Sequence, residues 1–429
     1  MIMSFSRKLF VLLLTRGSGL ILTFSISLFL ARIYGANITG KYYLFISILT
    51  GLSVITKLGL NSTLIKYCAH HTIENEKENI RGYWYTSIKI SLVISILLII
   101  LVTITNEIGF ISDYIRDNHK LFFYASISLI PFTILGHNIA VLTGLNRQTI
   151  ASIIETIALP FLFLSLILIL YFHYPANEQI LLLYTCALIT VFIISTLILW
   201  KKLHSNKTTV QVDTKSLLNT STPIFGINIT NFFTDWSATY ILAIFGTLGQ
   251  IGIYNVSWRL VTIMGIVLIV FNNINAPQYS KNFKEGNIAN IDITSRKTSI
   301  ILIWLGLPVI STIIIFAEDI LSLFGNEFIQ GAPILQILAI GQIFNFSTGS
   351  VGYLLLMTGH EKKLRNLTLC ICIFQIIALL IFIPQYNIYA AAIINSIAIA
   401  SKSVILAFIA FKSIGVLSLP VPKRREKSR

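Results

Sequence analysis

The chain has 429 residues, of which 55% are apolar and only 11% are charged, and its mean hydropathy is +0.81. Because soluble domains usually have about a quarter of their residues charged, this composition excludes an ordinary soluble protein. Apolar runs of about eighteen residues or more recur along the chain, and each can cross a hydrocarbon core of ~30 Å as a helix. The runs do not alternate in polarity, which excludes a membrane barrel.

The first apolar run extends from Leu9 to Leu30 and follows Arg7 and Lys8. It is too long for a secretory signal peptide, and no small-residue cleavage site follows it. We therefore expect a retained first helix and a mature chain that begins near Met1.

Hydropathy predicts about twelve transmembrane helices along the whole chain. The expected spans are roughly 9–31, 42–69, 83–105, 120–144, 149–171, 179–200, 217–246, 250–274, 297–317, 331–357, 367–384 and 388–413. With an even number of crossings, both termini lie on the same side of the membrane.

Lysine and arginine are distributed unevenly between alternate loops, which indicates the orientation. If the N-terminus is cytoplasmic, most loop cations fall on the cytoplasmic side, as is typical of inner-membrane proteins. The predicted outer segments hold only Arg32, Lys41, Arg116 and Lys120. We therefore expect cytoplasmic N and C termini, and the net charge of +15 reflects topology and is no evidence for nucleic-acid binding.

Two short patterns recur at about half the chain length. Leu-Thr-Gly at 142–144 recurs as Met-Thr-Gly at 357–359, 215 positions later, and the glycine-tyrosine turn at 35–42 recurs at 246–254. Six helices separate equivalent points, which predicts two six-helix lobes related by an axis along the membrane normal. We expect an N-terminal lobe over 1–200, a cytoplasmic linker over 201–216, a C-terminal lobe over 217–413 and a basic cytoplasmic tail over 414–429.

The loops leave no room for a soluble catalytic or nucleotide-binding module, since none exceeds roughly twenty residues. No Walker loop, zinc spacing or nucleophile elbow occurs. The seven histidines and four cysteines lack ligand spacing, so we expect no metal and no cofactor. The chain is therefore not expected to be an enzyme.

Three cations lie deep inside predicted spans, namely Arg16, Lys57 and Lys402. At 1.5 Å per residue they lie ~22 to 25 Å from the outer helix ends. A charge at mid-bilayer costs ~2.5 to 3.5 kcal/mol and usually faces a cavity or a partner. If the three converge from both lobes, they would attract phosphate or carboxylate groups and suit a pyrophosphate better than an organic cation.

The alternative is that each cation snorkels to the interface or pairs locally. We favour this alternative for Lys66, Lys89 and Lys412, which lie near predicted inner boundaries, and we expect Glu155 to balance Lys89.

Asp235 and Arg259 lie about eleven and nine residues from one outer turn, on consecutive antiparallel helices, and so at similar depth. One interpretation is a structural ion pair. The other is a coupling site, in which Asp235 exchanges a proton or cation while Arg259 alternates between Asp235 and an anionic substrate. The sequence leaves both open.

Several short motifs occur in a fixed order along nearly the whole chain. They are Ala31–Gly35 with Gly40–Tyr42, Leu58–Leu60, Gly252–Tyr254 with Arg259–Leu260, Phe324–Gly325 with Phe328, and Ile383–Pro384 with Ala390–Ala392. In this order they resemble the polysaccharide flippases of the multidrug/oligosaccharidyl-lipid/polysaccharide exporter superfamily, particularly the O-antigen (Wzx-type) translocases.

The resemblance implies two six-helix lobes around a cationic central cavity in a bacterial inner membrane. It implies that an undecaprenyl-pyrophosphate-linked oligosaccharide, such as an O-antigen repeat unit, is flipped to the outer leaflet by alternating access. It also implies membrane lipids, a periplasmic polymerase and a chain-length regulator as partners. Lipid II flippases usually have two helices more than the twelve expected here, so we do not expect a peptidoglycan role.

Two other classes stay open. A cation-coupled multidrug or solute exporter of the same superfamily shares the twelve-helix plan, but its cavity would favour acidic residues. A membrane-embedded polysaccharide polymerase or acyltransferase would typically have a large outer loop, whereas the largest here is about 106–119.

Overall fold

The computed structural model describes residues 2–73, 76–107, 119–173, 179–203 and 212–421. Within these ranges every regular element is helical. The elements are α1 (Ile2–Lys57), α2 (Leu60–Ile73), α3 (Lys77–Glu107), α5 (His119–Gly144), α6 (Gln148–Ser152), the π-helix η1 (Ile153–Ala158), α7 (Leu159–His173), α8 (Ile180–Leu203), α9 (Thr214–Phe245), α10 (Leu248–Lys284), α11 (Ile288–Ile315), α12 (Ala317–Ser322), the 3-10 helix η2 (Asn326–Gly331), α13 (Ala332–Thr348), α14 (Val351–Met357) and α15 (Glu361–Ile414).

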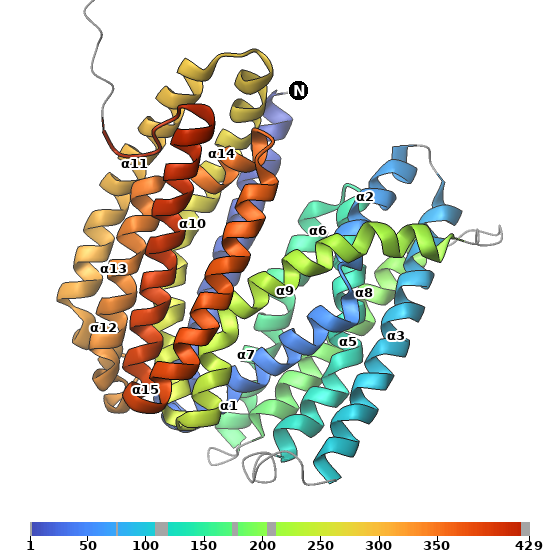
Figure 1. Cartoon of the computed structure of the whole chain (residues 1–429). Helices are drawn as coiled ribbons and strands as arrows, with labels where there is room; N and C mark the ends of the chain where they lie inside the picture. Colours follow the sequence, from blue (N-terminus) through green and yellow to red (C-terminus); the bar gives the residue numbers. More distant parts are fainter. Residues whose placement is uncertain (1, 74–75, 108–118, 174–178, 204–211, 422–429) are drawn as a thin grey trace, which may run out of the picture. The chain divides into compact units, whose positions relative to one another are not determined.

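Nine stretches of the described chain are long and apolar enough to cross a membrane. Two of these helices are broken near their middle, α1 at Gly35 (φ 76°) and α15 at Asn387 (φ 49°), so that each supplies two crossings (Figure 1). With α9, which has 32 residues, this makes the twelve expected crossings. The predicted fold class, an all-α multi-pass membrane protein, is confirmed.

The two breaks fall at turns that the sequence predicts between spans. Gly35 and Asn387 lie between the expected spans 9–31 and 42–69, and between 367–384 and 388–413. A left-handed backbone at one residue is enough to reverse a helix while nearly all hydrogen bonds are kept.

Two predicted spans are interrupted where hydropathy indicates continuous helices. The span 42–69 breaks at Leu58 (φ 44°) and Gly59 (φ 75°), and the span 331–357 breaks at Gly349 (φ 60°). A Cβ at Gly59 would lie 2.5 Å from the Ser221 carbonyl oxygen, and one at Gly349 would lie 2.7 Å from Ser299 Oγ. The breaks bring backbone close to neighbouring helices, and each lies inside a longer run that is apolar on average, so hydropathy does not reveal them.

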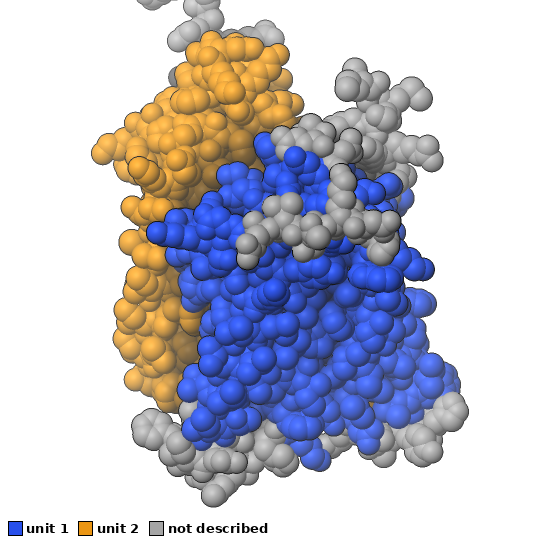
Figure 2. All heavy atoms as spheres, turned by 90° about the vertical axis from the view of Figure 1, so that its right-hand side faces the viewer, with its two compact units in different colours: residues 1–30, 41–232 blue, residues 31–40, 233–429 orange. Residues whose placement is uncertain are grey.

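The chain forms two compact units, which Figure 2 colours separately. Unit 1 contains residues 1–30 and 41–232, and unit 2 contains residues 31–40 and 233–429. In unit 1, α5 packs against α2, α3 and α8; in unit 2, α13 packs against α10, α11 and α15. The linker expected at 201–216 includes residues 204–211, which lie outside the described residues. The predicted lobes over 1–200 and 217–413 therefore stay a prediction.

The repeated glycine turns have a structural role within unit 2. A Cβ at Gly40 would collide with the Leu248 carbonyl, and a Cβ at Gly252 would collide with the Ala36 carbonyl. The segments 36–40 and 248–252 therefore pack backbone against backbone, which only glycine permits. The two copies of the sequence repeat contact each other at this point.

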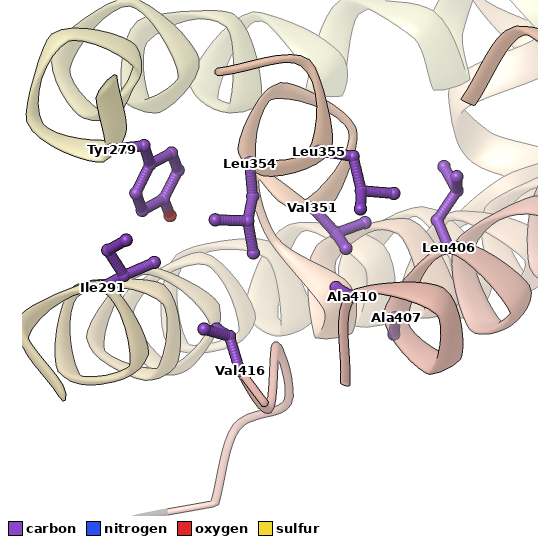
Figure 3. Close-up of a cluster of buried hydrophobic side chains, with 9 residues drawn as sticks. All are labelled: Tyr279, Ile291, Val351, Leu354, Leu355, Leu406, Ala407, Ala410 and Val416. Atoms are coloured by element: carbon purple, nitrogen blue, oxygen red, sulfur yellow. The ribbon is translucent and has the colours of Figure 1, made fainter. Parts of the chain in front are cut away.

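One end of unit 2 is held by a cluster of buried apolar side chains centred on α14 (Figure 3). The cluster joins α10, α11, α14, α15 and the segment that follows α15. It consists of Tyr279, Ile291, Val351, Leu354, Leu355, Leu406, Ala407, Ala410 and Val416. The two ends of α15 also meet here, since Lys363 Nζ donates a hydrogen bond to Ser413 Oγ at 2.7 Å.

The described part of the tail is bound to α11. Leu417 N donates to Asp292 Oδ1 at 2.9 Å, and Arg296 Nε donates to Asp292 Oδ2 at 2.9 Å. Ser418 accepts a hydrogen bond from Ser295 Oγ at 2.8 Å. Asp292 therefore ties the start of the expected cytoplasmic tail to the helical core.

We predict that Leu354→Ala destabilises unit 2, because Leu354 is fully buried at the centre of the cluster. Removing a buried leucine side chain typically costs about 2 to 5 kcal/mol, as packing contacts are lost and a cavity remains. Thermal unfolding in detergent should show a lower midpoint. Leu356→Ala, in the same helix but 43% exposed, should leave the midpoint nearly unchanged. Equal shifts for both variants would contradict the proposed role of the cluster.

Candidate functional site

Unit 2 contains a partly open cavity of about 360 Å³ between α9, α10, α13, α14 and α15. Polar side chains from α9, α10, α13 and α15 are part of its lining. They include Thr234, Asp235, Thr262, Asn272, Gln342, Asn345, Gln375, Asn395, Ser403 and Lys402. Polar groups within transmembrane helices usually mark a functional pathway, so this cavity is the first candidate site.

The reversal of α15 at Asn387 sets the depth of the cavity. Asn395 and Lys402 lie eight and fifteen residues beyond that turn, which corresponds to about 12 and 22 Å along the helix. Gln375 lies twelve residues before the turn, which corresponds to about 18 Å along the helix. The two halves of α15 therefore present these side chains to one interior space.

Gln375 is the most connected side chain of the cavity and is only 1% exposed. Its Nε2 donates to Asn395 Oδ1 at 2.6 Å and to the Thr234 carbonyl at 3.0 Å. Asn395 Nδ2 in turn donates to the hydroxyl of Tyr254, which is fully buried. Within the described residues, Gln375 Oε1 and Asn272 Oδ1 accept no hydrogen bond, so both keep acceptor capacity inside the protein.

The structure places Lys402, rather than Arg259, beside Asp235. The two side chains line the same cavity and interact electrostatically across it. Arg259 is partly buried in α10 and, within the described part of the chain, does not line this cavity or form an ion pair with Asp235. Unit 2 thus contains an intramembrane acid and base that face each other.

Unit 1 contains the second candidate site, at Lys57 in the last turn of the described α1. Lys57 Nζ lies 4.6 Å from the centroid of the Phe132 ring and 3.5 Å from Ser53 Oγ. A Cβ at Gly136 would lie only 2.7 Å from Lys57 Cε, so the glycine makes room for the lysine. The ammonium group is therefore held by an aromatic face and a hydroxyl, and among the described residues it forms no ion pair with a carboxylate.

A buried hydrogen-bonded histidine supports the Lys57 site. His137 is 0% exposed, and its Nε2 and Nδ1 lie 2.7 Å from Ser91 Oγ and 2.8 Å from Asn61 Oδ1. The neighbouring Asn138 accepts from Trp84 Nε1 and donates to Ser195 and Thr196, each at 2.9 Å. These contacts fix the α5 face against which Lys57 packs.

Arg16 and Glu155 lie on adjoining helices of unit 1. Thr15 Oγ1 lies 2.9 Å from Ser152 Oγ, and Thr156 Oγ1 donates to the Thr15 carbonyl at 3.2 Å. Arg16 is exposed, and Glu155 lies within the π-helix η1, a geometry often found at functional positions. Glu155 interacts electrostatically with Lys57 and so balances this lysine in part, while the expected balance of Lys89 stays a prediction.

The five predicted site residues fall into two groups. Arg16 and Lys57 belong to unit 1, and Asp235, Arg259 and Lys402 belong to unit 2. Their convergence on one cationic cavity stays a prediction. Among the described residues no cluster of three or more His, Cys, Asp or Glu could hold a metal ion.

Several polar residues of both sites were not singled out by the sequence analysis. They are Asn61, His137 and Asn138 in unit 1 and Gln375 and Asn395 in unit 2. A search for amides and histidines inside apolar spans, in addition to charges, would have found them. Such groups must find partners in the membrane and so report where helices face each other.

Comparison with known proteins gives one family match. The profile of a family described as "Polysaccharide biosynthesis protein" matches residues 5–283, which is more than half of the chain. A curated relative, "Probable low-salt glycan biosynthesis flippase Agl15" of Haloferax volcanii, is 24% identical over 199 residues. That match covers 45% of this chain and 41% of the relative, so it spans less than half of the relative's length.

Two solved structures share the fold along nearly their whole length. An inward-facing multidrug resistance MATE family transporter of the MOP superfamily has a TM-score of 0.73, with 13% identity, 92% of this chain and 94% of that chain covered. Lipid II flippase MurJ in an inward closed conformation has a TM-score of 0.71, with 13% identity, 93% of this chain and 87% of that chain covered. At these identities the likeness concerns the fold.

Proposed function

Because the chain belongs to the family of polysaccharide biosynthesis proteins, we propose that it is a flippase for lipid-linked glycans. The observation that carries the proposal is Lys57, an intramembrane ammonium group seated on an aromatic ring inside a helical unit. A lipid-linked sugar has an anionic phosphate or pyrophosphate group, and a partly desolvated lysine attracts such a group strongly. The family match and the flippase named as a relative support transport, in preference to catalysis.

We propose an undecaprenyl-pyrophosphate-linked oligosaccharide, such as an O-antigen repeat unit, as the substrate. In this proposal the protein lies in a bacterial inner membrane with cytoplasmic termini, and substrate moves from the cytoplasmic to the outer leaflet. A periplasmic polymerase and a chain-length regulator would receive the product. Arg16, Lys57 and Lys402 would contact the anionic group in an alternating-access cycle.

We further propose that Asp235 couples the cycle to a proton or a cation. Asp235 is open to the polar cavity of unit 2 and interacts with Lys402. When substrate phosphate approaches Lys402, Asp235 loses its partner and must take up a positive charge. The sequence suggested Arg259 on α10 as the partner of Asp235. In this proposal Arg259 is a second cation for the anionic substrate.

An export function for organic cations is the second candidate, and the acidic groups Asp235 and Glu155 favour it. Both acids are accessible side chains within transmembrane helices. A cationic drug would bind them directly, whereas Lys57 and Lys402 would oppose its entry.

The two candidates are distinguished by transport in reconstituted vesicles. We expect the purified protein to move a fluorescent undecaprenyl-pyrophosphate oligosaccharide between leaflets, and to move a neutral short-chain lipid much more slowly. Dithionite quenching of the outer leaflet measures both. If neither lipid moves but ethidium is exported down a proton or sodium gradient, the protein is a drug exporter and the flippase proposal is wrong.

A further inference from the structure

A second cavity of unit 2 lies where α15 reverses at Asn387. It lies away from the cluster of buried apolar side chains, which is found where the first and last residues of α15 meet. It has a volume of about 710 Å³. Four segments meet there: the break in α1, the turn between α9 and α10, η2 and the break in α15. In the orientation that the bias of lysine and arginine predicts, these turns lie on the outer side, to which the proposed flippase delivers the glycan.

Amide and tyrosine side chains dominate the lining of this cavity. Its polar residues are Asn37, Thr247, Gln250, Glu327, Gln330, Gln385 and Asn387, together with two tyrosines. Among the described lining residues there is no lysine, arginine or histidine, so the cavity does not suit a phosphate. One carboxylate and several amides instead supply many donors and acceptors side by side, which matches the hydroxyl groups of a neutral sugar.

The polar groups are held in place before any ligand binds. Glu327 Oε2 accepts a hydrogen bond from Ala36 N at 2.8 Å, and Gln330 Nε2 donates to the Glu327 carbonyl at 2.9 Å. Gln250 Oε1 accepts from Thr247 N at 3.1 Å. In each of these side chains one polar group forms a hydrogen bond to the backbone, and the other polar group can form a hydrogen bond to a ligand. A preorganised site loses less entropy on binding.

The backbone at this cavity adopts conformations that are rare for ordinary residues. Asn387 is a non-glycine residue with φ 49° and ψ −131°, and Gly35 has φ 76°. A Cβ at position 35 would lie 3.1 Å from Glu327 Oε2, so the glycine allows the carboxylate to approach. The reversal at Asn387 places Gln385 and Tyr386 on one side of the turn and Tyr389 on the other. All of them line the cavity.

The two tyrosines are exposed although they are large and partly apolar. Tyr386 is 59% exposed and Tyr389 is 47% exposed. An aromatic ring at the rim of a polar cavity can cover the apolar C–H face of a sugar ring, while its hydroxyl and the amides bond the sugar hydroxyls. Aromatic faces and bonding groups are therefore present together, as sugar recognition requires.

We propose that this cavity binds neutral sugar residues of the transported glycan at the delivery end of unit 2. The inference rests on the proposed function for the source of the sugar, and it adds a second contact to the anionic site. The lysines of the membrane interior hold the phosphate group, and this cavity selects the glycan by its hydroxyl groups. Glycan specificity would then reside in Gln385, Tyr386 and their neighbours.

The test measures binding of free sugars to the full-length protein in nanodiscs by saturation-transfer NMR. Chitobiose and maltotriose serve as the probes. We expect millimolar binding of at least one probe by the wild type, and about tenfold weaker binding by Gln385→Ala and Tyr386→Ala, which is about 1.4 kcal/mol. Tyr386→Phe retains the ring and should retain most of the affinity. Gln179→Ala, an exposed glutamine of unit 1, is the matched control and should bind like wild type.

The same variants are then assayed for flipping, so that the two proposals can fail separately. Lower flipping of the oligosaccharide-linked lipid by Gln385→Ala, with unchanged thermal unfolding, supports the sugar site. If the wild type flips the lipid-linked glycan but neither probe binds, or the variants bind like wild type, the sugar site is wrong and the flippase stands. If the probes bind at this cavity but no lipid moves, the sugar site stands and the flippase proposal is wrong.

Discussion

Asp235→Asn is expected to reduce flipping by about tenfold or more while the protein stays folded. The amide cannot take up or release a proton, and it leaves Lys402 without its acidic neighbour in the unit 2 cavity. Without an acidic neighbour, Lys402 favours the conformation of the transport cycle in which its ammonium group is best hydrated. A bias of about 1.4 kcal/mol between conformations changes their ratio tenfold, so a cycle that must visit both is slowed.

The measurement is the initial rate of lipid-linked oligosaccharide movement in vesicles, normalised to reconstituted protein. Asp319→Asn makes the same chemical change at an exposed acid of α12 in unit 2 and should keep the wild-type rate. The double variant Asp235→Asn with Lys402→Met removes both charges. If it regained full flipping, Asp235 would serve only to neutralise Lys402, and the coupling proposal would be wrong.

Lys57→Met is expected to have the second large effect, on apparent substrate affinity. Methionine keeps most of the length and an apolar tip near Phe132 but removes the charge that would attract the phosphate group. Hydrogen bonds to charged groups contribute about 1.5 to 3 kcal/mol, so half-saturation should need roughly tenfold to a hundredfold more substrate. Lys57→Arg should keep part of the affinity, because the charge is retained although Gly136 leaves little room for the larger group.

The measurement is the flipping rate as a function of lipid-linked oligosaccharide per protein. Lys284→Met, at the exposed end of α10, removes the same charge outside both candidate sites and should behave as wild type. If Lys57→Met and Lys284→Met gave the same concentration dependence, Lys57 would be a structural residue. Thermal unfolding of Lys57→Met shows whether any loss reflects misfolding.

At the Lys57 site the sequence could predict the lysine but not the residues around it. A lysine in an apolar span is visible from composition alone, because its insertion is costly and must have a reason. Its partners are not visible, since Phe132, Gly136 and Glu155 lie 75 to 98 positions away in the chain. From depth alone, Glu155 could balance Lys89, and only the structure brings Glu155 into electrostatic range of Lys57.

The neighbours of Asp235 were also not visible from the sequence. Depth along two antiparallel helices placed Asp235 level with Arg259, and depth is all that a span prediction provides. Which helix face each residue occupies depends on packing against α13 and α15, which no local pattern encodes. The structure instead places Asp235 in one cavity with Lys402, a residue 167 positions later in the chain.

Hydropathy by itself determined that the chain crosses the membrane about twelve times as helices, because each apolar run must satisfy its backbone hydrogen bonds internally in lipid. The glycine turn at 35–42 and the gap between the predicted spans 367–384 and 388–413 located the reversals that the structure has at Gly35 and Asn387. Only the tertiary structure decided where helices break within a span, as at Gly59 and Gly349, and which polar groups share a cavity. Those features depend on contacts between segments far apart in the chain, whose free energy appears only when the helices pack.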